Sequence, residues 1–192
     1  MVYANINSTK FKLDNYSIGN GTYTIETYYN NSLLCSSQLV VEGNIQYHAP
    51  LFQLSGLVKD DNYKLFKNIT IGTTVHDFFS TTKNNDVLEI YTKDSNLVYN
   101  KSNPDTIMKI ATGMYVTFYD DDLNKVKYTF SVKGDANGDG IISSKDYVVI
   151  RKHLMETAII TDTAELMASD YNMDNNITSK DYVQIRKYLM SS

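Results

Sequence analysis

The spacing of hydrophobic positions changes near residue 133. Before it, apolar and polar residues alternate in short runs, as in half-buried strands, and the strand-favouring residues Tyr and Thr are abundant. After it, apolar residues recur every three or four positions, the period of an amphipathic helix. The sequence therefore predicts a multidomain chain, with a mainly-β N-terminal region followed by an all-α segment.

The β region contains two predicted hairpins and one short helix. Predicted strands cover residues 23–29, 33–41, 63–71, 87–91, 115–119 and 126–132. Asn30-Asn31 separates the first two strands, and an acidic stretch around Asp121 separates the last two. In the last strand Val126, Tyr128, Phe130 and Val132 fall on one face. Between Thr74 and Asp77 the chain has the spacing of a capping box, which predicts a helix start.

Two acidic twelve-residue loops, 35 residues apart, precede the two predicted helices. Each has oxygen-bearing side chains at positions 1, 3, 5, 9 and 12 and a backbone carbonyl available at position 7, the ligand spacing of an EF-hand calcium loop. The first set of candidate ligands is Asp135, Asn137, Asp139, Ile141 (carbonyl), Ser143 and Asp146. The second set is Asp170, Asn172, Asp174, Asn176 (carbonyl), Thr178 and Asp181. The loops therefore predict two Ca²⁺ ions, with metal binding coupled to folding.

Two positions of these loops depart from the usual pattern. Position 12 is Asp, at Asp146 and Asp181, where an EF-hand usually carries Glu. Position 6 of the second loop is Asn175, where the first loop has Gly140. Asn adopts the left-handed conformation more readily than other residues with a side chain, so we expect Asn175 to make the same turn.

The residues after each loop repeat as well, and they predict two helices that pack on each other. Ser-Lys-Asp-Tyr-Val opens both segments, and Ile-Arg-Lys follows in both. The expected contact residues are Tyr147, Val148, Ile150 and Leu154 against Tyr182, Val183, Ile185 and Leu189. A further short helix is predicted after Asp162, with Glu165 completing its cap.

Composition excludes several function classes. The net charge is −4 with no basic block, which gives no support for nucleic-acid binding, and no apolar run is long enough to span a bilayer. A single cysteine, Cys35, excludes an intramolecular disulfide and is expected to be buried in a strand. The scattered histidines and the lack of a nucleophile motif predict a non-catalytic chain. Since no signal peptide follows Met1, we expect a C-terminal piece of a longer exported protein.

Residues 134–192 resemble a dockerin, the calcium-dependent docking module of cellulosome-type assemblies. The resemblance rests on Gly-Asp-Ala-Asn-Gly-Asp-Gly at Gly134, on Ile142 and Ile177 at loop position 8, and on the twofold repeat with its basic pairs. It implies a secreted protein in a bacterial cell-surface complex, with a cohesin module of a scaffoldin as partner. The implied cohesin contacts are Ser144, Lys145, Arg151, Lys152 and Glu156, or alternatively Ser179, Lys180, Arg186, Lys187 and Ser191. The near identity of the two sets suggests that either helix can face the partner.

The resemblance predicts three parts: residues 1–61, part of an immunoglobulin-like sandwich; residues 62–133, similar to small β modules that precede dockerins; and residues 134–192, the dockerin. Three alternatives remain open at this point. In the first alternative the β region is a carbohydrate-binding module tethered by the dockerin. In the second the chain is the tail of a secreted glycoside hydrolase. In the third alternative the repeat is a calcium-stabilised structure without a partner.

Overall fold

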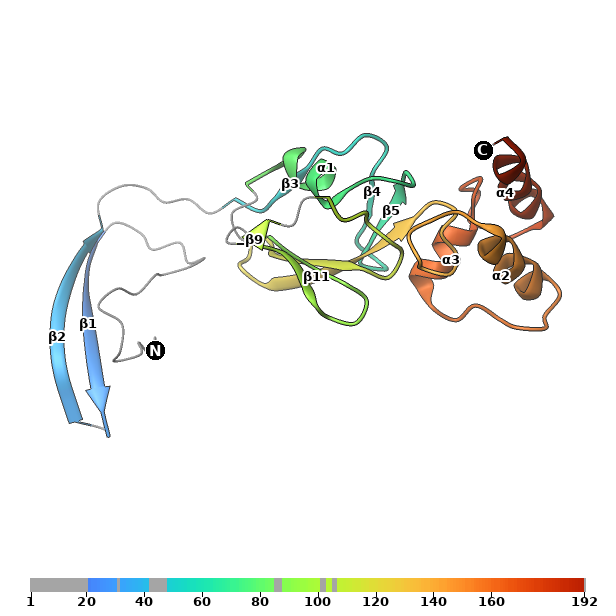
Figure 1. Cartoon of the computed structure of the whole chain (residues 1–192). Coiled ribbons are helices and arrows are strands. Elements are labelled where there is room, and N and C mark those ends of the chain that lie inside the picture. Colours follow the sequence, from blue (N-terminus) through green and yellow to red (C-terminus); the bar gives the residue numbers. More distant parts are fainter. Residues whose placement is uncertain are drawn as a thin grey trace. The chain divides into compact units, whose positions relative to one another are not determined.

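The computed structural model describes residues 21–30, 32–41, 48–84, 88–100, 103–104 and 107–191 (Figure 1). The chain divides into two compact units, Met1–His48 and Ala49–Ser192. None of the helices in these ranges has both the length and the apolar character needed to cross a membrane.

The described part of the first unit is an antiparallel hairpin. Strand β1 (Gly21–Tyr29) pairs with β2 (Ser32–Val41), and Asn30 takes a left-handed conformation in the turn, with φ of 45°. The predicted hairpin is therefore confirmed. Cys35 lies in β2 as expected, but it is exposed rather than buried. The immunoglobulin-like sandwich was predicted for residues 1–61, of which residues 1–20, 31 and 42–47 lie outside the described ranges, and it stays a prediction.

The second unit is built on a seven-stranded mixed sheet. Its spatial order is β4 (Val58–Asp60), β5 (Leu65–Ile69), β11 (Lys125–Val132), β10 (Tyr115–Tyr119), β7 (Glu89–Tyr91), β8 (Leu97–Asn100) and β9 (Asn103–Pro104). Neighbouring strands are antiparallel except β5 and β11, which are parallel. A second, two-stranded sheet pairs β3 (Leu51–Phe52) with β6 (Thr82–Lys83). Strand β11 is thus an inner strand, held by hydrogen bonds on both sides.

The core of this sheet is aromatic. Phe66 of β5, Phe78 of helix α1 (Val75–Ser80) and Phe130 of β11 are fully buried and contact one another. Tyr128 and Val132 are buried with Phe130, so the predicted alternation in the last strand is confirmed. The edge-to-face geometry of Phe78 on Phe130, with centroids 5.0 Å apart, is favourable for aromatic pairs.

Helix α1 begins where the capping box predicts. The Asp77 backbone N–H donates to Thr74 Oγ1 at 3.1 Å, and the Thr74 backbone N–H donates to Asp77 Oδ2 at 2.8 Å. These two reciprocal bonds satisfy N–H groups that a helix start would otherwise leave unpaired.

The predicted boundary after residue 61 does not coincide with a division in the structure. Strand β4 pairs with β5, so Val58 lies opposite Lys67 and Asp60 opposite Leu65. Asp60 is the last residue of β4, and Asp61 and Asn62 begin the tight turn that leads into β5. The second compact unit begins at Ala49.

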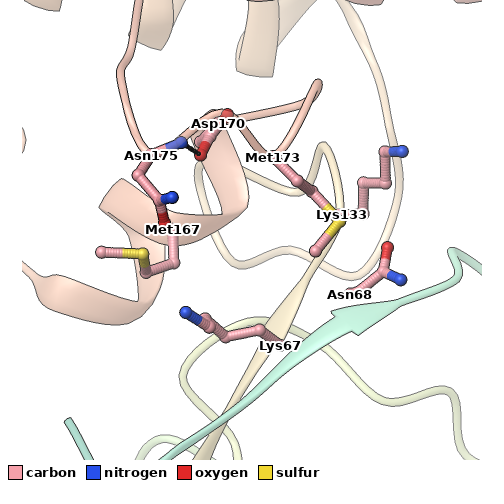
Figure 2. Close-up of a pocket in the computed structure, with 7 residues that line it drawn as sticks. All are labelled: Lys67, Asn68, Lys133, Met167, Asp170, Met173 and Asn175. Carbon is pink, nitrogen blue, oxygen red and sulfur yellow. Dashed lines mark hydrogen bonds between the residues drawn. The ribbon is translucent and has the colours of Figure 1, made fainter. Parts of the chain in front are cut away.

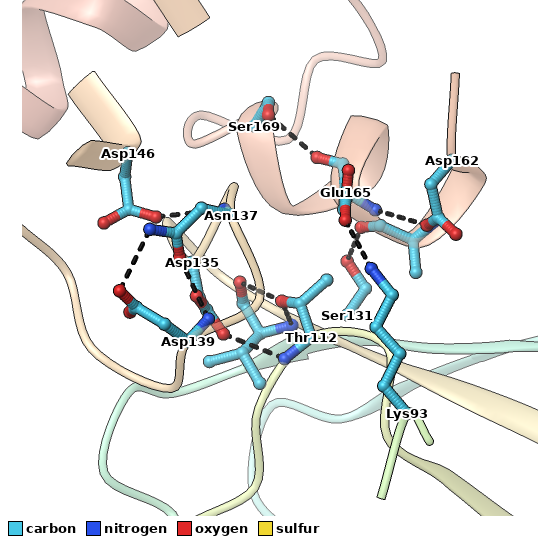
Figure 3. Close-up of polar contacts among 12 residues, drawn as sticks. Lys93, Thr112, Ser131, Asp135, Asn137, Asp139, Asp146, Asp162, Glu165 and Ser169 are labelled. Carbon is cyan, nitrogen blue, oxygen red and sulfur yellow. Dashed lines mark hydrogen bonds and ion pairs between the residues drawn. The ribbon is translucent and has the colours of Figure 1, made fainter. Parts of the chain in front are cut away.

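Three helices follow the sheet: α2 (Ser144–Leu154), α3 (Thr163–Ser169) and α4 (Ser179–Ser191). Helix α3 packs against β11, where Ser131 Oγ donates to the carbonyl of Ala164 at 2.8 Å. Asp162 caps α3 as predicted, but Glu165 does not complete that cap. Instead the Glu165 carboxylate pairs with Lys93 Nζ at 2.7 Å (Figure 3). The helical segment and the seven-stranded sheet therefore belong to one unit.

Candidate calcium loops and helix faces

The first acidic loop starts two residues after β11 and is organised by its own carboxylates. Asp135 Oδ2 accepts from the backbone N–H of Gly140 at 3.2 Å. Asp146 Oδ1 accepts from Asn137 N at 3.1 Å, and its Oδ2 accepts from Ser143 N at 2.8 Å. The ends and the middle of the loop are thus held around the side chains at positions 1 and 12.

The second loop repeats this arrangement. Asp170 Oδ2 accepts from Asn175 N at 2.7 Å, while Asp181 accepts from Asn172 N at 3.0 Å and from Thr178 N at 2.9 Å. Asn175 has φ of 65°, so the expected left-handed turn at position 6 is confirmed. Two independent stretches of chain therefore adopt one scaffold.

The side chains at positions 5 and 9 also make the same contacts in the two loops. At position 5, Asp139 Oδ2 accepts from the Asn137 side-chain amide at 3.0 Å, and Asp174 Oδ2 accepts from the Asn172 amide at 3.0 Å. At position 9, Ser143 is the N-cap of α2, where its Oγ accepts from the Lys145 backbone N–H. This capping role was not predicted, although Ser143 and Asp146 have the Ser-x-x-acid spacing that indicates it.

The residues of the loops fit a calcium ion. Asp135, Asp146 and Asp181 are fully buried. Asp135 Oδ1 is the one buried side-chain nitrogen or oxygen without a hydrogen-bond partner among the described residues. A buried, unpaired carboxylate oxygen is costly unless a cation or donor faces it. The donor set consists of oxygens alone, which is the chemistry Ca²⁺ prefers.

The electrostatics of the loops point the same way. Burial raises the pKa of Asp135, and the nearby carboxylates of Asp146 and Asp139 add to it, against hydrogen bonds from Thr112 and Gly140. Burial likewise raises the pKa of Asp146 and of Asp170. Carboxylates gathered in a low-dielectric site repel one another, and a divalent cation removes that cost.

Acidic side chains alone do not form a cage in these loops. Within the ranges that the structure describes, no group of three or more His, Cys, Asp and Glu side chains has the geometry of a metal site. EF-hand loops complete their coordination with amide side chains, a backbone carbonyl and water, and Asn137 and the carbonyl of Ile141 stand at those positions.

The helices after the loops pack in register. The rings of Tyr147 and Tyr182 stack with centroids 4.3 Å apart and their hydroxyls in contact, and Ile150 and Ile185 are fully buried beside them. Leu154, expected in this contact, is instead exposed and lies outside the buried cluster. Val148 and Val183, also expected there, are 41% and 43% exposed. Each follows its tyrosine by one residue, which turns it about 100° around the helix and away from the partner.

All ten residues implied as cohesin contacts are exposed. Most lie along the outer faces of α2 and α4, while Glu156 follows the end of α2 with φ of 56°. Four exposed apolar residues that were not predicted to face the partner lie on the same faces: Val148, Met155, Val183 and Met190. Their signal was present, since each member of one repeat has an apolar counterpart in the other.

Beside the second loop lies a small cavity. It holds about 40 Å³ and is lined by Lys67, Asn68, Lys133, Met167, Asp170, Met173 and Asn175 (Figure 2). Ligand pockets for organic molecules usually hold about 300 Å³ or more. The cavity is therefore part of the contact between the sheet and the loop rather than an additional ligand site.

Comparison with protein families decides the identity of the helical segment. The family model described as dockerin type I domain matches residues 133–190. Residues 133–190 form a dockerin type I domain. Searches of curated proteins and of solved structures returned no significant match. The resemblance seen in the sequence is confirmed for this segment, and a β-rich region precedes it.

Membership of this family carries several general properties. Dockerins bind calcium, and a dockerin implies a cohesin partner within a cellulosome. Dockerins are also typical of extracellular cellulosome proteins. In this chain the matched segment contains the two acidic loops Asp135–Asp146 and Asp170–Asp181, and α2 and α4 present its exposed faces.

The stacked tyrosine pair of strands β7 and β10 lends no support to sugar stacking. Tyr91 and Tyr115, from neighbouring strands, stack on each other with centroids 5.0 Å apart, and Lys127 Nζ lies 3.7 Å from the Tyr115 ring centroid. Both faces of Tyr115 are therefore occupied within the protein. A sugar ring needs an open aromatic face, which Tyr115 does not offer.

Proposed function

We propose that the dockerin anchors a secreted protein to a scaffoldin by binding a cohesin through the outer face of α2 or α4. The observation that carries this proposal is the matched pair of exposed faces. Each combines a basic pair, Arg151-Lys152 or Arg186-Lys187, with exposed apolar residues. Interfaces of this kind place apolar contacts beside charges that orient the partner. The function is binding, without a catalytic role for the chain.

Two Ca²⁺ ions are part of this proposal. The first would be held by Asp135, Asn137, Asp139, the Ile141 carbonyl, Ser143 through water, and Asp146. The second would be held by Asp170, Asn172, Asp174, the Asn176 carbonyl, Thr178 through water, and Asp181. Each ion would neutralise three carboxylates and fix the start of the helix that follows its loop.

The repeat also supports two binding orientations. The stacked pair Tyr147 and Tyr182 joins equivalent points of the two repeats, so a half-turn about this contact exchanges α2 and α4. The contact residues of the two faces agree except at the last position, Glu156 against Ser191. A cohesin that recognises one face therefore meets nearly the same chemistry on the other.

Calorimetry of the full chain tests the proposal. We expect the chain to take up two Ca²⁺ and, in calcium, to bind at least one cohesin of a panel. A chelator should abolish both the calcium uptake and the cohesin binding. The double variant Asp135→Ala with Asp170→Ala should lose the helical signal of the dockerin and all cohesin binding in excess calcium. Retained helix in that variant would refute the metal assignment.

Binding measurements on the same full chain distinguish the alternative functions. Failure of every cohesin, with calcium uptake intact, would favour a calcium-stabilised repeat without a partner. Retention of the chain on insoluble polysaccharide, unchanged by chelator, would favour a carbohydrate-binding β region.

A further inference from the structure

The two loops are repeats and both lie against the β region, but among the described residues only the first has its position-1 carboxylate hydrogen-bonded to that region. Asp135 Oδ2 accepts a second hydrogen bond, 2.8 Å long, from the backbone N–H of Thr112 (Figure 3). In the second loop the equivalent Asp170 accepts from Asp174 and Asn175 of its own loop, at 3.1 and 2.7 Å. The position-1 carboxylate is thus shared with the sheet in one repeat and internal in the other.

Glycines show how closely the first loop approaches this part of the sheet. A Cβ on Gly138 would lie 2.7 Å from the carbonyl oxygen of Thr112, and one on Gly140 would lie 3.3 Å from Ala111 Cβ. The equivalent residues of the second loop are Met173 and Asn175, which have the same left-handed φ of 62° and 65° and are exposed. The second loop therefore tolerates side chains where the first requires their absence.

The donor itself is firmly held. Thr112 is fully buried, and its Oγ1 accepts from Val132 N at 3.0 Å. The next backbone N–H, that of Gly113, donates to the carbonyl of Phe130 at 3.0 Å. Both partners belong to β11, the inner strand that runs into the first loop. The turn of residues 111–113 and the loop are thus fixed to the same strand.

We propose that the turn of residues 111–113 is a positioning element of the first calcium site, which makes the two sites unequal and couples the first to the folding of the sheet. The Thr112 N–H holds Asp135 Oδ2, so that the buried Oδ1 is left for the metal. Partners that orient a ligand in this way typically change metal affinity about 10- to 100-fold when lost. Because binding linkage is reciprocal, calcium in the first loop must stabilise the sheet in turn. The inference rests on the proposed calcium occupancy of that loop.

A matched pair of alanines tests the affinity of the first site. Gly138→Ala and Met173→Ala place the same side chain at position 4 of either loop, and only the first meets Thr112. By calorimetry on the full chain, Gly138→Ala should weaken one of the two sites about tenfold or more, and Met173→Ala should leave both within about twofold of the parent. Gly138→Asn controls for left-handed strain, which Asn tolerates. Parent-like affinity in Gly138→Asn would overturn the proposal.

Hydrogen exchange tests the reciprocal effect and does not depend on the folding of the glycine variants. In the parent, calcium should slow exchange of the amides of Thr112, Gly113 and Val132. Asp135→Asn should abolish this response, and Asp170→Asn should keep it. Equal loss in the two variants would overturn the proposal, because the sheet would then sense only the folded dockerin.

Calcium uptake and cohesin binding of the parent are measured in the same samples. If the parent binds calcium and cohesin but the variants of the two loops behave alike, this inference is wrong and the proposed function stands. If the parent takes up no calcium, the proposed function itself is wrong.

Discussion

Tyr147 and Tyr182, equivalent residues of the two repeats, stack on each other across the contact of α2 with α4. Aromatic pairs contribute about 0.5–1.5 kcal/mol beyond the area they bury. A double-mutant cycle of Tyr147→Leu and Tyr182→Leu, followed by chemical unfolding in calcium, should give a coupling energy in this range. The exposed neighbours supply the control, since Val148→Ala with Val183→Ala should show a coupling near zero. If the effects of the two tyrosine substitutions on the free energy of unfolding are additive, the stack contributes no specific interaction energy.

Loss of one basic pair should hardly affect cohesin binding. Arg151→Ala with Lys152→Ala removes one face, and the second face still binds, so the association constant should fall roughly twofold, equivalent to about 0.4 kcal/mol. The quadruple variant that also carries Arg186→Ala and Lys187→Ala should lose binding by at least a hundredfold.

Two exposed lysines of the β region, Lys83 and Lys109, provide the matched charge control for the basic pairs. Their replacement by alanine should leave the affinity unchanged when measured by titration calorimetry. Complete loss of binding on removal of a single basic pair would contradict two orientations and establish one face as the binding surface.

The two polar contacts between the sheet and α3 should contribute unequally to stability. Ser131→Ala removes a buried hydrogen bond to the carbonyl of Ala164, which should lower the free energy of unfolding by about 1 kcal/mol. Lys93→Met removes a pair whose lysine is half exposed, and its cost should stay below about 1 kcal/mol. Urea unfolding of both variants in calcium makes the comparison, and a larger effect of Lys93→Met would reverse this ranking.

The ion pair of Asp60 and Lys67 should make the sheet sensitive to acid. The bond from Lys67 lowers the pKa of Asp60, helped by the backbone N–H of Tyr63 and opposed by burial. A lowered carboxyl pKa stabilises the fold above the unfolded pKa of about 3.9 and loses this effect as pH falls through the folded value.

The Lys67→Met variant isolates this contribution. It should be less stable than the parent above about pH 5, and the difference should shrink as the pH is lowered below the unfolded pKa. Thermal unfolding of both proteins across this range measures it. A difference that grows on acidification would show the opposite linkage.

The spacing of residues close in the sequence was sufficient to predict much of the fold and of the candidate site. The turns of both acidic loops, the helices that follow them and the cap at Thr74 each depend on residues within one turn or loop, so the sequence predicted them. The helix faces were harder, because apolar spacing does not distinguish Val148, on the exposed face, from Tyr147 in the contact. In the dockerin, apolar residues serve both the core and the outer face.

Long-range contacts were not predictable. The bond from Thr112 to Asp135 joins residues 23 positions apart and depends on the turn before β10 lying against β11. Alternation identified β5 and β11 as strands, but alternation carries no information on which strands pair or in which direction. The parallel pair, and with it the attachment of the first loop, required the structure.

The short connection between β11 and the first loop also determines how tension would travel. A load on the docked helices would enter the sheet along β11, whose hydrogen bonds to β5 and β10 lie across the direction of pull and would share the force. Bonds loaded together resist longer than bonds opened one by one. We expect single-molecule stretching to rupture the sheet at higher force than a strand peeled from the edge, so the anchor would suit an enzyme complex exposed to fluid drag.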